Sequence, residues 1–510
     1  MAQPRPGGTS RHRATTPRKA GGRAAVLATA LSAAATLQAT TGPAPAAATP
    51  AMATLPATAR ADVTPADATR ADAPPRHAPP RHAPPRHAPP RHAPPAPATR
   101  ATPPWTEGPV FNDPLGTDKA QHTIRTRLVR LTDAAVPGST VKAAVHHLWE
   151  APVVDALLHA RERGVDVQVL LDSTSRTDRP NNPAYSRLAT SLGTDRRKKS
   201  FVSLCPADKS CLGDPRHGKS IMHNKFWLFS EVASEVAGDV AGARDVVVQT
   251  TSNSTPSAHT KFFNDALLLP GNPALYDAFA AYFDDMLRGD WRGWDYRTAS
   301  SGLYKTYFFP REGTLDETDT LYEVLNNVSC AYKDANGVER RTRVRASVFK
   351  ITRKRIADKL VSLKKAGCAV DLVYAETDSA RSQGGTPGTW EALHRPGGPS
   401  LRCYNDDRDP LAPGRKLTTP YIIHSKYVLI DGVYDGRRNK VSFTGSQNYT
   451  APALRENDEV IVKVDDDSVH DTYRAHFDRV RKAAWPGTAD RTDLCRGVKP
   501  LPPDGEKPTG

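Results

Sequence analysis

The chain contains two copies of one sequence pattern, and this duplication limits the folds open to it. Residues 153–172, VVDALLHARERGVDVQVLLD, match residues 356–376, IADKLVSLKKAGCAVDLVYAE. In each copy, apolar residues at helical spacing lead to Lys or Arg, then to Gly, and then to an apolar run. This order predicts a helix, a turn and a buried strand. The two halves are therefore expected to be copies of one α/β fold.

A rarer pattern recurs at matched positions of both halves. HNKFWLFS begins at His223 and HSKYVLID begins at His424, 59 and 57 residues after the respective turn glycines. Each half then runs through a β-rich segment to an Asn, and on to an Asn-Asp pair before an aliphatic strand. These residues are Asn253 and Asp265 in the first half, and Asn448 and Asp458 in the second. The repeat thus includes polar residues that a buried strand would not need for packing.

The N-terminal part of the chain differs in composition from the rest. Residues 1–48 join a basic stretch to an Ala-rich apolar run and small residues, which is the layout of a secretory signal peptide. Residues 49–104 repeat PPRHA, which predicts an extended spacer without a core. We therefore expect a secreted protein, with the spacer as a tether or a wall-spanning segment. The expected remaining parts are an N-terminal lobe at 105–298, a C-terminal lobe at 299–495 and a tail at 496–510.

The high net charge does not by itself indicate a nucleic-acid-binding protein. The whole chain carries +15, of which the first 104 residues contribute +10 and the rest only +5. The expected lobes are therefore close to balanced, and they show no helix-turn-helix or zinc-finger spacing. Six cysteines in an exported chain are compatible with disulfides, although the sequence leaves their pairing open.

The His-x-Lys pairs suit chemistry on a phosphate group. Residues two apart in a strand share a face, so each histidine points the same way as its lysine. Lys and Asn can hold the oxygens of a phosphate while an imidazole attacks or protonates. Two such sets facing each other would need no metal or other cofactor. The candidate catalytic residues are His223, Lys225, Asn253, His424, Lys426 and Asn448.

These motifs resemble those of the phospholipase D superfamily, which is named for its His-Lys-Asp motif, and the resemblance runs from about Val110 to Trp485. It implies two pseudo-symmetric α/β/α sandwich lobes with the active site at their interface. It also implies that His223 forms a phosphohistidine, and that His424 protonates the leaving alcohol and then activates water. Asp265 and Asp458 are expected to accept the other ring N–H of these histidines. Asp458 is preferred to Glu459 because it keeps step with Asp265.

The first half departs from the motif of this family. Ser230 stands where the second half has Asp431, and the interval from His to Asn is 30 residues instead of 24. The motif Asp does not itself handle the phosphate, so we expect catalysis to tolerate Ser230. Seven aromatic residues crowd the junction between the halves, where we expect packing between the lobes with a lipid-docking surface as the alternative. They are Trp291, Trp294, Tyr296, Tyr304, Tyr307, Phe308 and Phe309.

Exported chains of this size with two motifs resemble secreted bacterial phospholipases D. The resemblance implies hydrolysis of a glycerophospholipid such as phosphatidylcholine, at a membrane or vesicle surface, to phosphatidic acid and a free alcohol. A second alcohol replacing water would give headgroup exchange. We expect a monomer. Two alternatives stay open: an exported nuclease or general phosphodiesterase acting on nucleic acid, and a lipid- or wall-binding protein with a degenerate site.

Overall fold

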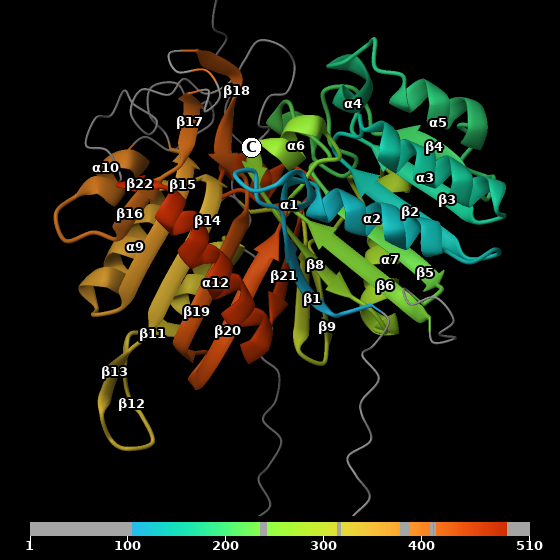
Figure 1. The fold of residues 1–510 in the computed structure, drawn as a ribbon. Coiled ribbons are helices and arrows are strands. Elements are labelled where there is room, and N and C mark those ends of the chain that lie inside the picture. The colour runs from blue at the N-terminus through green and yellow to red at the C-terminus, as the bar shows by residue number, and fades with distance from the viewer. Residues whose placement is uncertain are drawn as a thin grey trace, which may run out of the picture. The chain divides into compact units, whose positions relative to one another are not determined.

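A computed structural model of the chain describes residues 105–234, 242–313, 318–377, 388–408, 412 and 415–486. The predicted signal peptide, spacer and C-terminal tail lie outside these residues and stay predictions. Two large sheets, each with helices on both faces, make up most of the described chain (Figure 1).

The first sheet has the strand order β1-β8-β6-β5-β2-β3-β4. Strands β2, β3 and β4 run parallel, whereas β5, β6, β8 and β1 are added antiparallel. Its strands are β1 Gly108–Phe111, β2 Thr140–Val145, β3 Asp166–Leu171, β4 Phe201–Leu204, β5 Lys225–Val232, β6 Ala243–Thr250 and β8 Asp265–Leu269. The helices of this lobe are α1 Asp118–Gln121, α2 Thr123–Ala134, α3 Ala151–Glu162, α4 Thr174–Thr177, α5 Ala184–Leu192, the 3₁₀ turn η1 Pro215–His217, α6 Pro256–Thr260 and α7 Pro273–Arg288.

The second sheet has the order β22-β16-β15-β14-β19-β20-β21-β10-β9, with β11 added on β19. Its strands are β9 Arg297–Ser301, β10 Tyr304–Phe308, β11 Val328–Ser329, β14 Arg343–Lys350, β15 Ala369–Glu376, β16 Ser400–Cys403, β19 Lys426–Tyr434, β20 Arg437–Gly445, β21 Val460–Val464 and β22 Trp485–Pro486. The helices are α8 Thr320–Asn326, α9 Lys354–Lys365, α10 Thr389–His394, α11 Ala451–Arg455 and α12 Asp467–Ala483. A separate hairpin joins β12 Ala331–Lys333 to β13 Glu339–Arg341.

The two sheets match strand for strand. The series β4-β3-β2-β5-β6-β8-β1 corresponds to β16-β15-β14-β19-β20-β21-β10. The repeated sequence segments form α3 with β3 and α9 with β15, each as helix, turn and strand. The predicted duplicated α/β fold is therefore confirmed. The expected lobe division at residue 298 falls inside β9, which pairs with β10 in the second sheet.

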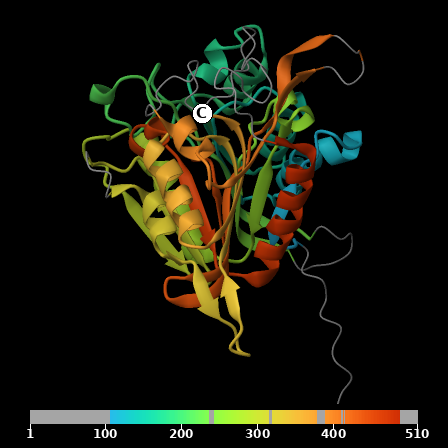
Figure 2. The same cartoon turned by 90° about the vertical axis from the view of Figure 1, so that its left-hand side faces the viewer.

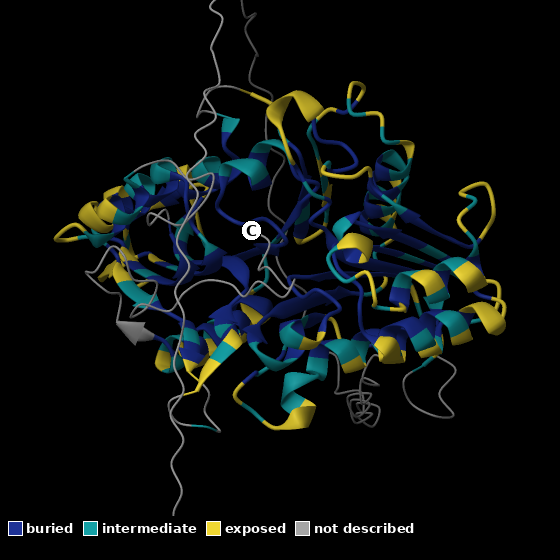
Figure 3. Ribbon diagram, turned by 90° about the horizontal axis from the view of Figure 1, so that it is seen from above, coloured by how far each residue is buried: buried dark blue, intermediate teal, exposed yellow. Residues whose placement is uncertain are grey.

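Three hydrophobic clusters fill the spaces between the sheets and the helices that cover them. Both faces of each sheet contribute, because successive side chains of a strand point to opposite faces. On β2, Val141, Ala143 and Val145 pack with α2, α3 and α5, while Ala144 faces the opposite way. Helices α8, α9 and α10 cover one face of the second sheet and α12 covers the other, as Figure 2 shows for α9 and α12. The buried residues follow the strands, and the exposed ones lie mainly on the outer helices and loops (Figure 3).

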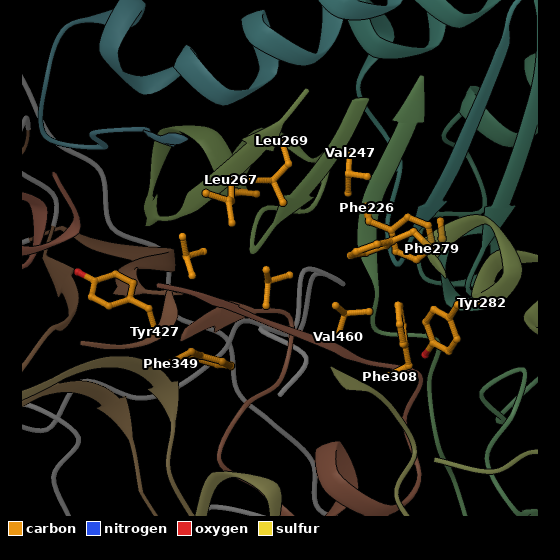
Figure 4. Packing of buried hydrophobic residues seen from close by; sticks show 14 of the residues in the cluster. Phe226, Val247, Leu267, Leu269, Phe279, Tyr282, Phe308, Phe349, Tyr427 and Val460 are labelled. Atoms are coloured by element: carbon orange, nitrogen blue, oxygen red, sulfur yellow. The ribbon is translucent and has the colours of Figure 1, made fainter. Parts of the chain in front are cut away.

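One hydrophobic cluster is shared by both lobes. It brings Phe226 and Phe279 of the first lobe together with Phe308, Tyr427 and Val460 of the second (Figure 4). The aromatic residues Trp294 and Tyr304 belong to the same cluster, which agrees with the expected packing between lobes. Burial of this continuous apolar surface is the main force that fixes one lobe against the other.

Backbone pairing also crosses between the lobes just before each motif histidine. A small sheet orders β17 (Asn405–Arg408), β18 (Lys416–Ile423) and β7 (Phe262–Phe263), with β18 and β7 parallel. The matching contact in the other direction is a parallel bridge between Met222 and Asp458. The residue directly before each motif histidine thus pairs with the backbone of the opposite lobe.

The cysteines form disulfides. Cys205 pairs with Cys211 and Cys330 pairs with Cys368, and Cys403 is also disulfide-bonded. In the part of the chain that the structure describes, none of the helices is both long enough and apolar enough for a membrane span.

Candidate active site

The motif histidines and lysines lie at the start of β5 and β19, near the middle of each sheet. Lys225 and Lys426 open these strands, and each histidine stands two residues before its lysine. Lys225 Nζ donates to the carbonyl of His223 at 2.7 Å, and Lys426 Nζ donates to that of His424 at 2.5 Å. All four side chains are buried, with at most 4% exposed. Each pair is therefore held as one rigid unit.

Each histidine is oriented by the opposite lobe. His223 donates its backbone N–H to the Asp458 carbonyl at 3.0 Å, and its Nδ1 lies 2.8 Å from Glu459 Oε1. His424 N–H donates to the carbonyl of the residue before Asn264, and its Nδ1 lies 2.8 Å from Asn264 Oδ1. An ionised carboxylate only accepts, so His223 carries its proton on Nδ1. In this tautomer the proton is on Nδ1 and not on Nε2 of His223.

The amide of Asn264 is fixed by its other contacts. Its Nδ2 donates to the Ala258 carbonyl at 2.8 Å, and its Oδ1 accepts from Thr251 Oγ1 at 3.0 Å. The oxygen therefore faces His424, whose Nδ1 must be the donor. His424 and His223 thus take the same tautomer. The Nδ1 proton of His424 points to an amide oxygen, and that of His223 points to a carboxylate.

The expected carboxylate partners of the histidines were wrong. Asp265 instead accepts from Thr444 Oγ1 at 2.5 Å and Tyr473 OH at 3.0 Å. Asp458 accepts the backbone N–H groups of Cys211 at 2.6 Å and Leu212 at 3.0 Å. Both aspartates therefore bridge the lobes, and their hydrogen-bond partners in the opposite lobe are hydroxyl groups and backbone N–H groups.

A shift of one residue in the alignment explains the error. His223 N–H bonds to the carbonyl of Asp458, and His424 N–H bonds to that of Phe263, so Asp458 matches Phe263 and Glu459 matches Asn264. Matching the two Asn-Asp pairs by their letters is therefore off by one. Because neighbouring strand residues point to opposite faces, this shift exchanges the residue that meets the histidine for one that does not.

Asn253 and Asn448 follow β6 and β20, directly before the turns into α6 and α11. Both are buried, and within the described ranges Asn253 Oδ1 and both amide atoms of Asn448 have no hydrogen-bond partner. The same is true of His424 Nε2. Buried polar atoms are normally hydrogen-bonded, so these atoms at the ends of strands from both sheets indicate a site for a polar ligand.

Burial sets the electrostatics of the four basic groups. Burial lowers the pKa of His223 to about 4, although Glu459 opposes the shift, and it lowers the pKa of Lys225 to about 7. Burial likewise lowers the pKa values of His424 and Lys426 well below their usual range, and the positive charge of Lys225 adds to both effects. An anion placed among these groups would favour their charged forms. Such clustered perturbation is typical of functional sites.

Ser230 and Asp431 lie away from the imidazoles. Each is five residues beyond the motif lysine along an extended strand, which corresponds to about 16 Å. Ser230 Oγ accepts the backbone N–H of Thr140 at 2.8 Å, which joins β5 to the start of β2. The motif Asp is thus replaced at a position where the side chain contacts the backbone of a neighbouring strand, away from the imidazoles.

Two further histidines lie beside His223, and the sequence comparison missed them. The ring centroid of His146 is 5.3 Å from that of His223 and 3.8 Å from that of His147, on which it stacks. In the second lobe Phe349 takes the corresponding place, with its centroid 5.2 Å from that of His424. The His-His pair at the end of β2 was the available signal, but it has no repeat in the second half.

Among the described residues, one group of potential metal ligands lies close together, and it consists of Cys205, Cys211 and Asp458. Both sulfurs are joined in a disulfide, and only a thiolate is a strong metal ligand. Asp458 is already bonded to two backbone N–H groups of the same loop. The donor set therefore does not fit a metal ion.

The duplicated fold agrees with the comparison to known families. Residues 130–287 and 339–481, more than half of the chain, match the model of a family described as "Cardiolipin synthase, PLD-like domain". The chain therefore belongs to this phospholipase D-like family. It is a phosphodiesterase-type enzyme of the phospholipase D superfamily. None of the curated proteins matches the sequence.

Three solved structures illustrate the structural likeness. Polyphosphate kinase from Porphyromonas gingivalis matches 79% of this chain at 15% identity with a TM-score of 0.45, and the match spans only about half of that kinase, 55%. Phosphatidylserine synthase from Haemophilus influenzae matches 76% of this chain and 88% of its own, at 12% identity and a TM-score of 0.49. Nuc from Salmonella typhimurium, a phospholipase D family member, matches 36% of this chain and 96% of its own, at 19% identity and a TM-score of 0.26.

Proposed function

We propose that this protein is a secreted, monomeric phospholipase D that hydrolyses the headgroup phosphodiester of a glycerophospholipid such as phosphatidylcholine. One observation carries the proposal: His223 and His424 are buried, each is paired with a lysine, and each has its Nδ1 held by the opposite lobe. Two imidazoles that both present Nε2 can share the two steps of a phosphodiester displacement.

In the first step, Nε2 of His223 attacks phosphorus, and the bond from phosphorus to the headgroup oxygen breaks. A phosphorus–nitrogen bond forms, and His424 in its protonated form gives a proton to the departing alcohol. Lys225 and Lys426 balance the charge on the non-bridging oxygens, and the Asn448 amide supplies a further donor. The bound diester anion raises the pKa of His424, because an opposite charge favours the protonated ring.

In the second step, water attacks the phosphohistidine. Neutral His424 takes a proton from the water, the phosphorus–nitrogen bond breaks, and His223 is restored with phosphatidic acid as the product. An alcohol in place of water would give the exchanged phospholipid by the same route. Acid–base assistance of this kind contributes roughly 10²–10⁴-fold to the rate.

The two ring partners support this division of roles. Glu459 is an acid and stabilises the positive ring that forms when His223 attacks, whereas Asn264 is neutral. His424 on an amide holds its proton more weakly, which suits a group that must donate and recover a proton within one cycle. The carboxylate therefore lies behind the proposed nucleophile and the amide behind the proposed acid.

Secretion is supported by the signal-peptide pattern and by the disulfides of the described chain. Cys205–Cys211 and Cys330–Cys368 are of the kind that persists in oxidising, extracytoplasmic compartments. The proline-rich spacer would then place the two lobes at a distance from the point where the chain leaves the cell, or in contact with the cell wall.

The test is incubation of the purified protein with phosphatidylcholine vesicles and ethanol, following choline and phosphatidylethanol. We expect both products from the native chain, neither from His223→Ala, and full activity from the surface control Lys364→Gln. Choline without phosphatidylethanol would limit the reaction to hydrolysis.

If the native chain releases no choline, phosphatidylcholine is not the substrate. DNA, RNA and other phospholipids would then be tried with the same variants, because the nuclease alternative uses the same catalytic groups. Lipid binding that persists in His223→Ala without turnover on any of these substrates would indicate the degenerate binding protein.

A further inference from the structure

We propose a second phosphate-binding site, on the C-terminal lobe at the start of α9, which takes a phosphomonoester or inorganic phosphate. A cavity of about 620 Å³ opens there between α8, α9 and α11. Its size suits a phosphate group with part of an attached headgroup. This site is separate from the four motif side chains and goes beyond the proposed phospholipase activity.

The cavity is lined mainly by basic side chains. Five cationic residues stand against two carboxylates, which are Asp319 and Asp358. The cationic residues are Arg353, Lys354, Arg355, Lys359 and Arg455. The excess of positive charge favours an anion, and guanidinium groups suit the tetrahedral oxygens of phosphate in particular.

The strongest evidence for the site is the buried side chain of Arg353. Its side chain is only 6% exposed, and its Nη1 pairs with Asp319 Oδ2. Its Nε and Nη2 have no hydrogen-bond partner within the described ranges. Leaving two donors of a buried guanidinium unsatisfied is costly, and a phosphate oxygen in the adjoining cavity would satisfy them.

The backbone adds to the attraction. Arg353 is also the N-cap of α9, a helix of 12 residues, and it makes no side-chain capping bond. The N-terminus of such a helix carries partial positive charge and unpaired N–H groups, both of which favour an anion. Arg355 lies over the ring of Tyr322, 3.8 Å from its centroid, which holds this guanidinium against the wall formed by α8.

The corresponding place in the first lobe has the opposite charge, and its carboxylate lies within ion-pair distance of two basic side chains. Trp149 N–H donates to the Ser254 carbonyl as Thr352 N–H donates to that of Tyr449, so Glu150 matches Arg353. Glu150 caps α3, and it lies 2.7 Å from His259 Nε2 and 3.3 Å from Arg125 Nη1. The shared fold therefore does not require a buried cation at this position.

The proposed phosphate site adjoins the segment that carries Asn448. Arg353 N–H donates to the carbonyl of Tyr449 at 3.1 Å, and Tyr449 directly follows Asn448. Ala451, Leu454 and Arg455 of α11, a few residues further on, line the same cavity. An anion held here would lie beside the segment that carries Asn448 and would contact the first turn of α9.

The test is equilibrium dialysis of the full chain with labelled inorganic phosphate at low ionic strength. We expect two equivalents to bind to the native protein, one at the motif residues and one at Arg353. Arg353→Gln should bind a single equivalent, whereas the matched control Lys364→Gln, on the last turn of the same helix, should bind two. Unchanged stoichiometry and affinity in Arg353→Gln would overturn the proposal.

A second variant guards against misfolding of Arg353→Gln. Lys354→Gln combined with Lys359→Gln removes two partly exposed charges. We expect the double variant to bind phosphate at the second site roughly tenfold more weakly, because each partly exposed charge contributes about threefold. No change in this double variant, with native thermal unfolding, also contradicts the site. Because both readouts measure binding, they are independent of whether phosphatidylcholine is cleaved.

The source of the phosphate is decided by displacement of the label from the second site. Dihexanoyl phosphatidic acid that displaces it at lower concentration than inorganic phosphate would assign the site to a lipid headgroup. The reverse order would assign it to free phosphate. Failure of both compounds to displace the label, at concentrations that saturate the native protein, would contradict a phosphate-specific site.

Discussion

The N-terminal and C-terminal lobes share their strand order, but they carry different groups at equivalent positions. Glu459 contacts the ring of one motif histidine and Asn264 contacts the ring of the other. His146 lies beside His223, where the second lobe has Phe349 beside His424. The scaffold of the duplication has been retained while the chemistry of its two halves has diverged. A symmetric fold is therefore compatible with the asymmetric reaction proposed above, in which one histidine attacks and the other transfers protons.

The largest effects are expected from replacing the two histidines, whose proposed roles can be distinguished by changing the leaving group of the substrate. His223→Ala should abolish cleavage of both phosphatidylcholine and a p-nitrophenyl phosphodiester, because no nucleophile remains. His424→Ala should lose roughly 10²–10⁴-fold on phosphatidylcholine but far less on the p-nitrophenyl ester, whose leaving group needs no proton. The measurement is initial rates on both substrates. Equal losses for the two variants on both substrates would remove the proposed division of roles.

The second-largest effects are expected from exchanging the residues that contact the histidine rings, Glu459 and Asn264. Glu459→Gln removes the charge that opposes the low pKa of His223, so its pKa should fall further, and we expect roughly a tenfold loss in kcat. Asn264→Asp places a carboxylate on His424 and should raise its pKa, which moves the alkaline limb of the kcat profile to higher pH. Rate profiles from pH 4 to 10 test both. An alkaline limb that stays in place in Asn264→Asp would show that His424 does not supply the proton.

The interface aspartates should affect stability more than chemistry. Asp458→Ala leaves two buried N–H groups, those of Cys211 and Leu212, without their acceptor. Each lost acceptor costs about 1–3 kcal/mol, so a substantial drop in the free energy of unfolding is expected. Asp265→Ala removes an acceptor of the Thr444, Tyr473 and Thr251 hydroxyl groups, which can turn to other acceptors, and should cost less. Urea unfolding of both variants measures the difference, and a larger cost for Asp265→Ala would contradict it.

The smallest effect is expected at Ser230, where the first motif differs from the second. Ser230→Asp restores the family residue at a site about 16 Å along the strand from Lys225. We expect kcat to change less than about twofold, with stability within about 1 kcal/mol, as for most substitutions away from a core or site. Asp431→Ser is the reciprocal variant. A tenfold gain in kcat from Ser230→Asp would show that the first motif had been weakened.

The sequence predicted the duplication and the motif side chains because both are local patterns. Helical spacing ending in Gly identified α3 and α9, and the His-x-Lys spacing placed both side chains on one face. The ring partners could not be found in this way. Glu459 lies 236 residues from His223, and Asn264 lies 160 residues from His424. Only the docking of the lobes brings these residues together.

The one-residue error at Asp458 has a related cause. The letters Asn-Asp occur in both halves, but the structure matches Asn264 to Glu459, so similarity of letters and similarity of position disagree. The buried Arg353 was missed for another reason. In the sequence it stands in ITRKRIADK, which has the appearance of a charged, solvated helix start. Its burial depends on Asp319 and on the neighbouring helix α8.

The crossed support of the two histidines means that neither lobe alone contains the complete proposed site. His223 acquires its ring partner only when the C-terminal lobe has folded and docked, and that lobe is synthesised last. A nascent or translocating chain therefore has no assembled nucleophile, even when its first lobe is complete. For an enzyme proposed to attack phospholipids, this order of assembly would protect the membranes of the producing cell until the chain had finished folding.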